Sequence, residues 1–141
     1  MDEHVPMVEA SRFGSHVHVR RSNGAEAFVW ANGSIMSVEA PSHTASHGQT
    51  IDLAVLDEVF AYEDDRVEQA VAPAMISRPS PQLWLTSTAG GERSWYLWRK
   101  IESGREHVDR PGGVAYFEWS APDDADPANP EVWRACMPAL D

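Results

Sequence analysis

The stretch Ile51-Asp52-Leu53-Ala54-Val55-Leu56-Asp57-Glu58 is a short apolar run that ends on two adjacent carboxylates. An apolar run of this length is typical of a buried strand in a parallel sheet. Two carboxylates at a strand end can divide the work of phosphoryl transfer. Asp57 would hold a magnesium ion through a bound water, and Glu58 would polarise the attacking water. The stretch therefore predicts both a sheet and a candidate site for nucleotide hydrolysis at its edge.

A second apolar run, Leu83-Trp84-Leu85, ends on the hydroxyl residues Thr86-Ser87-Thr88. In open α/β sheets the ligand lies beyond the carboxyl ends of the parallel strands. We therefore expect Asp57, Glu58 and the three hydroxyl residues along the same edge of one sheet. The competing interpretation is that these polar residues only satisfy backbone groups where each strand enters a turn.

The rest of the pattern alternates strands and helices. The expected elements are a strand over 51–56, a helix that begins at Asp64-Asp65 and ends before Pro79, a strand from Gln82 to Gly90, a helix from Ser94 to an exit at Gly104, a strand over 114–119 and a short helix over 131–136. This alternation predicts an α/β fold with a parallel sheet and right-handed crossovers.

A hairpin precedes this alternation. The runs Ala27-Phe28-Val29-Trp30 and Ile35-Met36-Ser37-Val38 flank Asn32-Gly33, a pair suited to a tight turn with positive φ at both central residues. Residues before about Ser22 mix charge, histidine and a few apolar positions, and they predict no clear element. Residues 40–50 are rich in Ser, His and Thr and predict a loop.

Composition limits what this chain binds by itself. The formal net charge is −11, with 22 acidic and 11 basic residues. Such a balance argues against a grip on a nucleic-acid backbone, which needs Lys and Arg. A phosphate-binding loop of the form G-x-x-x-x-G-K-[ST] needs a lysine, and the single lysine, Lys100, follows no such glycines. We therefore expect either that another chain supplies the groups that bind the triphosphate, or that this chain does not bind it.

Two further observations concern the compartment. Cys136 is the single cysteine, so an internal disulfide is impossible and a reducing compartment is expected. The sequence has no apolar run near the length of a membrane-spanning helix, so we expect a soluble, cytoplasmic protein without a membrane partner.

Four segments, in this order, carry a resemblance to a known family. They are Phe28 to Val38, His47-Gly48-Gln49-Thr50-Ile51-Asp52-Leu53-Ala54-Val55-Leu56-Asp57-Glu58, Leu83-Trp84-Leu85-Thr86-Ser87-Thr88-Ala89-Gly90, and Tyr116-Phe117-Glu118-Trp119-Ser120-Ala121-Pro122. Together they resemble the ATPase domain of the large terminase subunit of tailed bacteriophages, from about Glu26 to Leu140. The ordered set is much more specific than an apolar run followed by Asp-Glu.

The resemblance implies roles for the same residues. Asp57 corresponds to the Walker B aspartate that positions magnesium, and Glu58 to the catalytic glutamate. Thr86, Ser87 and Thr88 match the coupling motif, whose hydroxyls near the γ-phosphate of ATP link hydrolysis to movement of DNA. The family implies a P-loop NTPase-type (ASCE) sheet with an inserted hairpin, ATP and Mg²⁺ as cofactors, and double-stranded DNA, other terminase subunits and the portal as partners.

The resemblance also implies a partial domain. Residues 1–25 would form a poorly defined segment, and residues 26–141 would form an ATPase domain without the strand and loop of Walker A, and without the nuclease domain. We therefore expect an internal fragment, from a split gene, a prophage remnant or a truncated open reading frame. Its ATP hydrolysis would require a second chain that carries the phosphate-binding loop. The alternative is a non-enzymatic, acidic interaction protein or a degenerate remnant, so enzyme activity stays open at this point.

Overall fold

The computed structural model of the chain describes residues 4–40, 48–137 and 139. His47 and most of the predicted 40–50 loop lie outside these ranges. The chain divides into two compact units. The first contains Met1–Leu56 and Asp64–Thr86, and the second contains Asp57–Glu63 and Ser87–Asp141.

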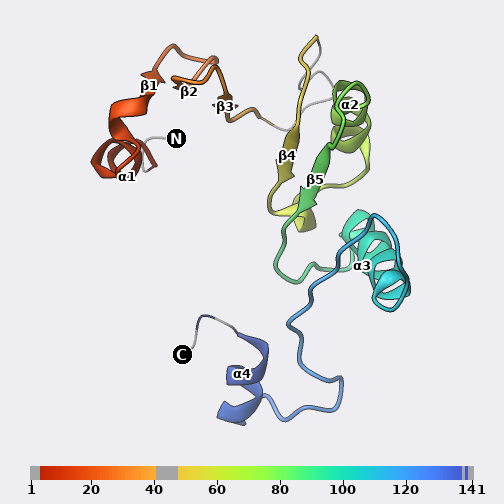
Figure 1. Cartoon of the computed structure of the whole chain (residues 1–141). Coiled ribbons are helices and arrows are strands. Elements are labelled where there is room, and N and C mark those ends of the chain that lie inside the picture. Colours follow the sequence, from red (N-terminus) through yellow and green to blue (C-terminus); the bar gives the residue numbers. More distant parts are fainter. Residues whose placement is uncertain (1–3, 41–47, 138, 140–141) are drawn as a thin grey trace. The chain divides into compact units, whose positions relative to one another are not determined.

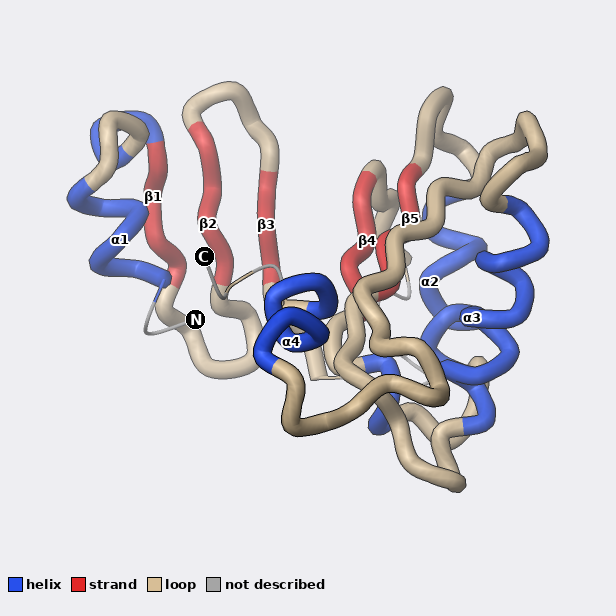
Figure 2. The backbone as a smooth tube through the Cα atoms, turned by 90° about the horizontal axis from the view of Figure 1, so that it is seen from below, coloured by secondary structure: helices blue, strands red, loops and turns tan. Residues whose placement is uncertain are grey.

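The first unit contains a three-stranded antiparallel sheet. Its strands β1 (Val17–Arg20), β2 (Ala27–Trp30) and β3 (Ile35–Ser37) are ordered β1-β2-β3, and they run side by side in Figure 2. The pairing of β2 with β3 confirms the predicted hairpin. Ala27 and Phe28 are its buried side chains, at 0% and 2% exposure.

The hairpin turn differs from the prediction. The Gly33 N–H donates to the Trp30 carbonyl at 2.9 Å, and the Trp30 N–H donates to the Ser34 carbonyl at 2.9 Å. The loop therefore has three residues. Gly33 has a φ of 87°, whereas Asn32 is not among the residues with positive φ. The Asn32 side chain instead accepts the Ser34 N–H at 3.0 Å. This is the three-residue loop in which a left-handed glycine closes the turn.

The segment before the hairpin, for which the pattern predicts no clear element, is ordered into α1 (His4–Ala10), the short 3-10 helix η1 (Gly14–His16) and β1. In β1 the half-buried Val17 and Val19 alternate with the exposed His18 and Arg20. This two-residue alternation is the signal that identifies a half-buried strand. It is short and lies among charged residues, so it is easily overlooked.

The first unit also contains the predicted parallel pair. Strand β4 (Leu53–Leu56) pairs in parallel with β5 (Gln82–Leu85), with Leu56 opposite Leu85. Helix α2 (Arg66–Met75) connects them and lies alongside them in Figures 1 and 2. The predicted continuation of β5 to Gly90 is wrong. The Thr86 N–H donates to the Leu56 carbonyl at 3.0 Å, and β4 offers no partner beyond that point.

Helix α2 has the predicted apolar face, on which Ala70, Val71 and Met75 are buried. Its start differs in one detail. Asp64 accepts the Arg66 N–H at 3.1 Å, whereas Asp65 occupies the N-cap position without a capping bond from its side chain.

In the second unit the short 3-10 helix η2 (Val59–Ala61), α3 (Trp95–His107) and α4 (Pro130–Cys136) are the regular elements. The predicted short helix over 131–136 is confirmed as α4, which Asn129 caps by accepting the Glu131 N–H at 3.0 Å. The predicted exit at Gly104 is wrong, because α3 continues to His107. Gly104 is buried within the helix, where a Cβ atom would collide with the ring of Tyr116.

The predicted strand over Val114–Trp119 is also wrong, since these residues belong to no helix or strand. A strand needs a neighbour to complete its hydrogen bonds. Within the described residues, no strand pairs with residues 114–119. The described fold is therefore mixed α/β, with a parallel pair of strands and a separate antiparallel sheet. Within 4–40 and 48–137, no helix has the length and apolar character to cross a membrane.

Candidate functional site

The chain turns sharply where β4 ends. Leu56 is buried, and the next two residues, Asp57 and Glu58, are exposed. Glu58 has φ 53° and ψ 44°, and among the described residues other than glycine it is the one with positive φ. The Asp57 carboxylate accepts the Glu58 N–H at 2.9 Å. A left-handed backbone is costly for a residue with a side chain, and such strain is concentrated at functional sites.

The turn continues into η2, where the hydroxyl of Ser87 meets it. The Phe60 N–H donates to the Ser87 hydroxyl at 3.0 Å, and that hydroxyl donates to the Thr88 carbonyl at 2.8 Å. The hydroxyl segment after β5 is thereby tied to the turn that follows the carboxylate pair. The sequence predicted that the carboxylates and the hydroxyl residues lie along one edge of a sheet. The hydrogen bond from the Phe60 N–H shows that Ser87 contacts the turn two residues beyond Glu58.

The other two hydroxyl residues are placed through their backbones. Thr86 extends the ladder of the parallel pair through its N–H, and Thr88 accepts from Ser87. All three of Thr86, Ser87 and Thr88 are exposed.

Sequence reasoning missed two residues of this site. Ser94 is buried, at 6% exposure, and its hydroxyl donates to the Phe60 carbonyl at 2.7 Å. Its place at the start of the expected helix indicates no more than a cap, and Ser94 does occupy the N-cap position of α3. Tyr62 stacks on Tyr96 with ring centroids 6.3 Å apart, and nothing in the local pattern singles it out.

Tyr62 lies within reach of the charge of the carboxylate pair. Partial burial raises the pKa of its phenol above the ordinary 10.0, and the negative charges of Asp57 and Glu58 raise it further. The phenol therefore stays protonated through neutral pH, and it remains a hydrogen-bond donor beside two anionic groups.

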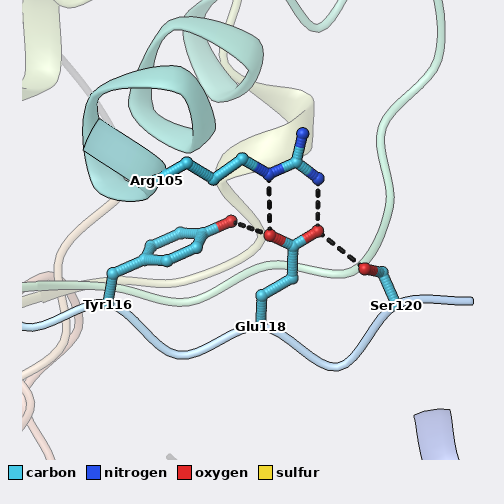
Figure 3. A network of polar contacts seen from close by, with 4 residues as sticks. All are labelled: Arg105, Tyr116, Glu118 and Ser120. Carbon is cyan, nitrogen blue, oxygen red and sulfur yellow. Dashed lines mark hydrogen bonds and ion pairs between the residues drawn. The ribbon is translucent and has the colours of Figure 1, made fainter. Parts of the chain in front are cut away.

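A second polar cluster lies on α3 and the extended segment after it (Figure 3). Arg105 donates two hydrogen bonds to the Glu118 carboxylate, at 2.9 and 2.5 Å, and Tyr116 and Ser120 donate one each, at 2.6 and 2.8 Å. The bonds from Arg105, and then those from Tyr116 and Ser120, lower the pKa of Glu118 to about 2. These four bonds occupy the carboxylate. We therefore interpret the cluster as an anchor for residues 116–120 rather than as a reactive site.

The described residues contain no group of three or more His, Cys, Asp or Glu side chains placed to hold a metal ion. Magnesium needs no such cage, since in nucleotide sites it is bound by one or two carboxylates together with substrate phosphates and water. An exposed carboxylate directly after a strand, as at Asp57, is a donor of this kind. The residues present therefore fit a magnesium ion that arrives with a nucleotide.

The parallel pair of strands β4 and β5, with exposed carboxylates following β4 and exposed hydroxyl residues following β5, belongs to a mixed α/β fold. That fold is similar to a solved structure, the crystal structure of the HK97 bacteriophage large terminase, at a TM-score of 0.79 and 25% sequence identity. The match covers 96% of this chain and 28% of that terminase, so this chain spans under a third of its length. No family model and no curated protein matches the sequence. The resemblance to phage large terminases is thus confirmed at the level of structure.

Proposed function

We propose that this chain is the part of a phage or prophage large terminase that carries the metal-binding and water-activating carboxylates of a DNA-packaging ATPase in the host cytoplasm. The observation that carries the proposal is the strained turn at Glu58, tied through Phe60 to Ser87 after the neighbouring strand. A similarity to a solved terminase over 96% of the chain supports it.

In this proposal the roles follow from the chemistry of the side chains. Mg²⁺ bound with ATP would neutralise charge that develops on the phosphate oxygens. Asp57 would hold that ion, and Glu58 would orient and polarise the attacking water. Thr86, Ser87 and Thr88 would sense the γ-phosphate through their hydroxyls. The Ser87 hydroxyl is bonded to the turn after Glu58, so a shift at Ser87 would reach that turn directly.

The phosphate-binding loop would come from a second polypeptide segment. Lys100 lies within α3, and its ammonium group is 5.4 Å from the centre of the Tyr96 ring. A lysine in that setting cannot complete a glycine-rich loop. Residues 26–141 would thus form a partial P-loop NTPase-type domain. Other terminase subunits and the portal would be its partners. Because this chain has a net charge of −11, those partners would supply the basic surface that binds double-stranded DNA.

Reconstitution tests the proposal. The chain is assayed for Mg²⁺-dependent ATP hydrolysis alone and after co-expression with the segment of a terminase that carries the phosphate-binding loop. We expect hydrolysis only in the second case. Hydrolysis by the chain alone would contradict the requirement for a second segment. A stable complex with no hydrolysis would contradict the catalytic assignment.

One observation favours a second candidate, the acidic interaction protein. Leu53, Val55 and Trp84 lie on one face of the parallel pair and are 54%, 55% and 57% exposed. Parallel sheets are normally covered on both faces, so this apolar face suits a protein contact. A non-enzymatic role predicts that partner binding depends on Val55 and Trp84 and is indifferent to Glu58→Gln.

A further inference from the structure

Ser94 is a buried polar side chain whose hydroxyl does not perform the task expected at its position. A serine at an N-cap normally accepts a hydrogen bond from the second or third N–H of its own helix. Ser94 makes no such bond to α3. Its hydroxyl accepts the Gly91 N–H at 3.2 Å and donates to the Phe60 carbonyl at 2.7 Å. The Ser94 hydroxyl is thus hydrogen-bonded to the turn after Glu58 and not to its own helix.

The peptide groups of Phe60 are held from both directions. Its N–H donates to Ser87 at 3.0 Å, and its carbonyl accepts from Ser94. The same turn is closed by the Ala61 N–H, which donates to the Glu58 carbonyl at 2.9 Å. A residue with a side chain stays in the left-handed region only where its surroundings over-determine it. These bonds supply that constraint for Glu58.

We propose that Ser94 is a positioning residue, which fixes the left-handed conformation of Glu58 by holding the Phe60 carbonyl. The significance of this for catalysis rests on the proposed role of Glu58. The claim that Ser94 fixes the backbone of Glu58 concerns the second unit alone, and it can be tested without a nucleotide.

Gly90 provides an independent test of the same contact. A Cβ atom at Gly90 would lie 2.5 Å from the Ser94 Cβ, 2.6 Å from the Ser94 hydroxyl oxygen and 3.1 Å from Leu97 Cδ2, whereas a Cβ atom at Gly91 would meet nothing within 4 Å. Neither glycine has a positive φ. Gly90→Ala should therefore displace the Ser94 side chain and move its hydroxyl away from the Phe60 carbonyl while leaving that hydroxyl in the protein, and Gly91→Ala is the matched control.

The experiment is a double-mutant cycle read by hydrogen exchange at the Phe60 amide. Glycine adopts the left-handed conformation without strain, so Glu58→Gly should raise the protection factor of that amide about fivefold when Ser94 is present. In the Ser94→Ala protein the turn is free to relax, and the same change should give less than a twofold gain. Equal gains in both backgrounds would overturn the proposal, because residues that do not interact contribute additively.

The glycine pair keeps the test decisive if Ser94→Ala fails to fold. Gly90→Ala should lower Phe60 protection about tenfold and Gly91→Ala less than twofold. A similar loss in both, or in neither, would contradict the proposal. In a hydrolysing complex with the loop-bearing segment, Ser94→Ala should lower kcat at least tenfold with KM for ATP unchanged. If the exchange cycle succeeds and no complex hydrolyses ATP, the proposed function fails and the positioning by Ser94 stands.

Discussion

Arg105 and Glu118 form a two-pronged ion pair in which Nε of the guanidinium lies 2.9 Å from one carboxylate oxygen and Nη2 lies 2.5 Å from the other. The pair joins the last turns of α3 to an extended segment without strand partners (Figure 3). In place of a backbone ladder, side-chain hydrogen bonds hold that segment.

The ion pair predicts how the stability of this region depends on pH. The pKa of Glu118 is about 2 in the folded chain, against an ordinary value of 4.5. A carboxyl group whose pKa is lowered by folding stabilises the fold above its unfolded pKa, and that contribution is lost as the pH falls from about 4.5 towards 2. Arg105→Gln should return the pKa of Glu118 part of the way towards 4.5 and weaken this pH dependence, because the hydrogen bonds from Tyr116 and Ser120 remain. A carbon-detected NMR titration of the Glu118 carboxyl measures the pKa of this group in both proteins.

Arg99→Gln is the control for that titration. Arg99 lies on the same helix, with its guanidinium 5.5 Å from the centre of the Trp95 ring. Its removal should leave the pKa of Glu118 at about 2. An equal rise of the Glu118 pKa in both variants would show that the general charge of α3, and not the paired geometry, sets it.

The position of Gly104 predicts that replacing it with alanine will lower the stability of the protein, which is the opposite of the usual effect inside a helix. Glycine to alanine inside a helix normally stabilises by up to about 1 kcal/mol. Here the new methyl group would collide with the ring of Tyr116, so we expect Gly104→Ala to destabilise by about 1–3 kcal/mol, as overpacking does. Urea unfolding measures the change. In a Tyr116→Ala background the same substitution should become neutral or stabilising, and persistent destabilisation there would contradict the contact.

The hairpin turn makes a similar prediction through backbone conformation alone. Gly33 has a φ of 87° and open space around its Cα, so only strain opposes a side chain there. Gly33→Ala should cost about 1 kcal/mol in the free energy of unfolding. Gly113→Ala, also in open space but without a positive φ, should have no measurable cost. Equal effects at the two positions would argue against the three-residue turn.

The metal assignment of Asp57 is tested by magnesium dependence in the complex with a loop-bearing segment. Asp57→Asn removes the charge but keeps the shape, so we expect the Mg²⁺ concentration for half-maximal hydrolysis to rise at least tenfold. Asp65→Asn is the control, because Asp65 lies at the start of α2 and has no assigned role. An unchanged Mg²⁺ requirement in Asp57→Asn would remove Asp57 from the metal site.

The sequence predicted the parts of the fold whose signals are local. The apolar runs before Asp57 and before Thr86 became β4 and β5, and their parallel pairing followed from the helix between them. The hairpin followed from two apolar runs around Asn32-Gly33. The turn was predicted one residue too short, because loop length depends on how the strands pair.

The remaining features depend on contacts that no local pattern encodes. Val114–Trp119 has the composition of a strand, yet a strand exists only beside a partner. Gly104 resembles a helix exit until the position of Tyr116 is known. The left-handed backbone of Glu58 and the missing cap bond of Ser94 both depend on the hydrogen bond from the Ser94 hydroxyl to the Phe60 carbonyl. No local pattern in the sequence singles out Phe60.

The most direct test of the catalytic assignment is the rate of ATP hydrolysis by the complex of this chain with a loop-bearing terminase segment, compared between Glu58→Gln and Glu63→Gln. Both residues are exposed carboxylates around η2, so the two variants lose the same charge and differ only in position. A base that activates water contributes about 10²–10⁴-fold to the rate. We predict a loss of at least a hundredfold in Glu58→Gln and less than twofold in Glu63→Gln. Equal rates in the two variants would contradict the assignment of Glu58 as the catalytic residue.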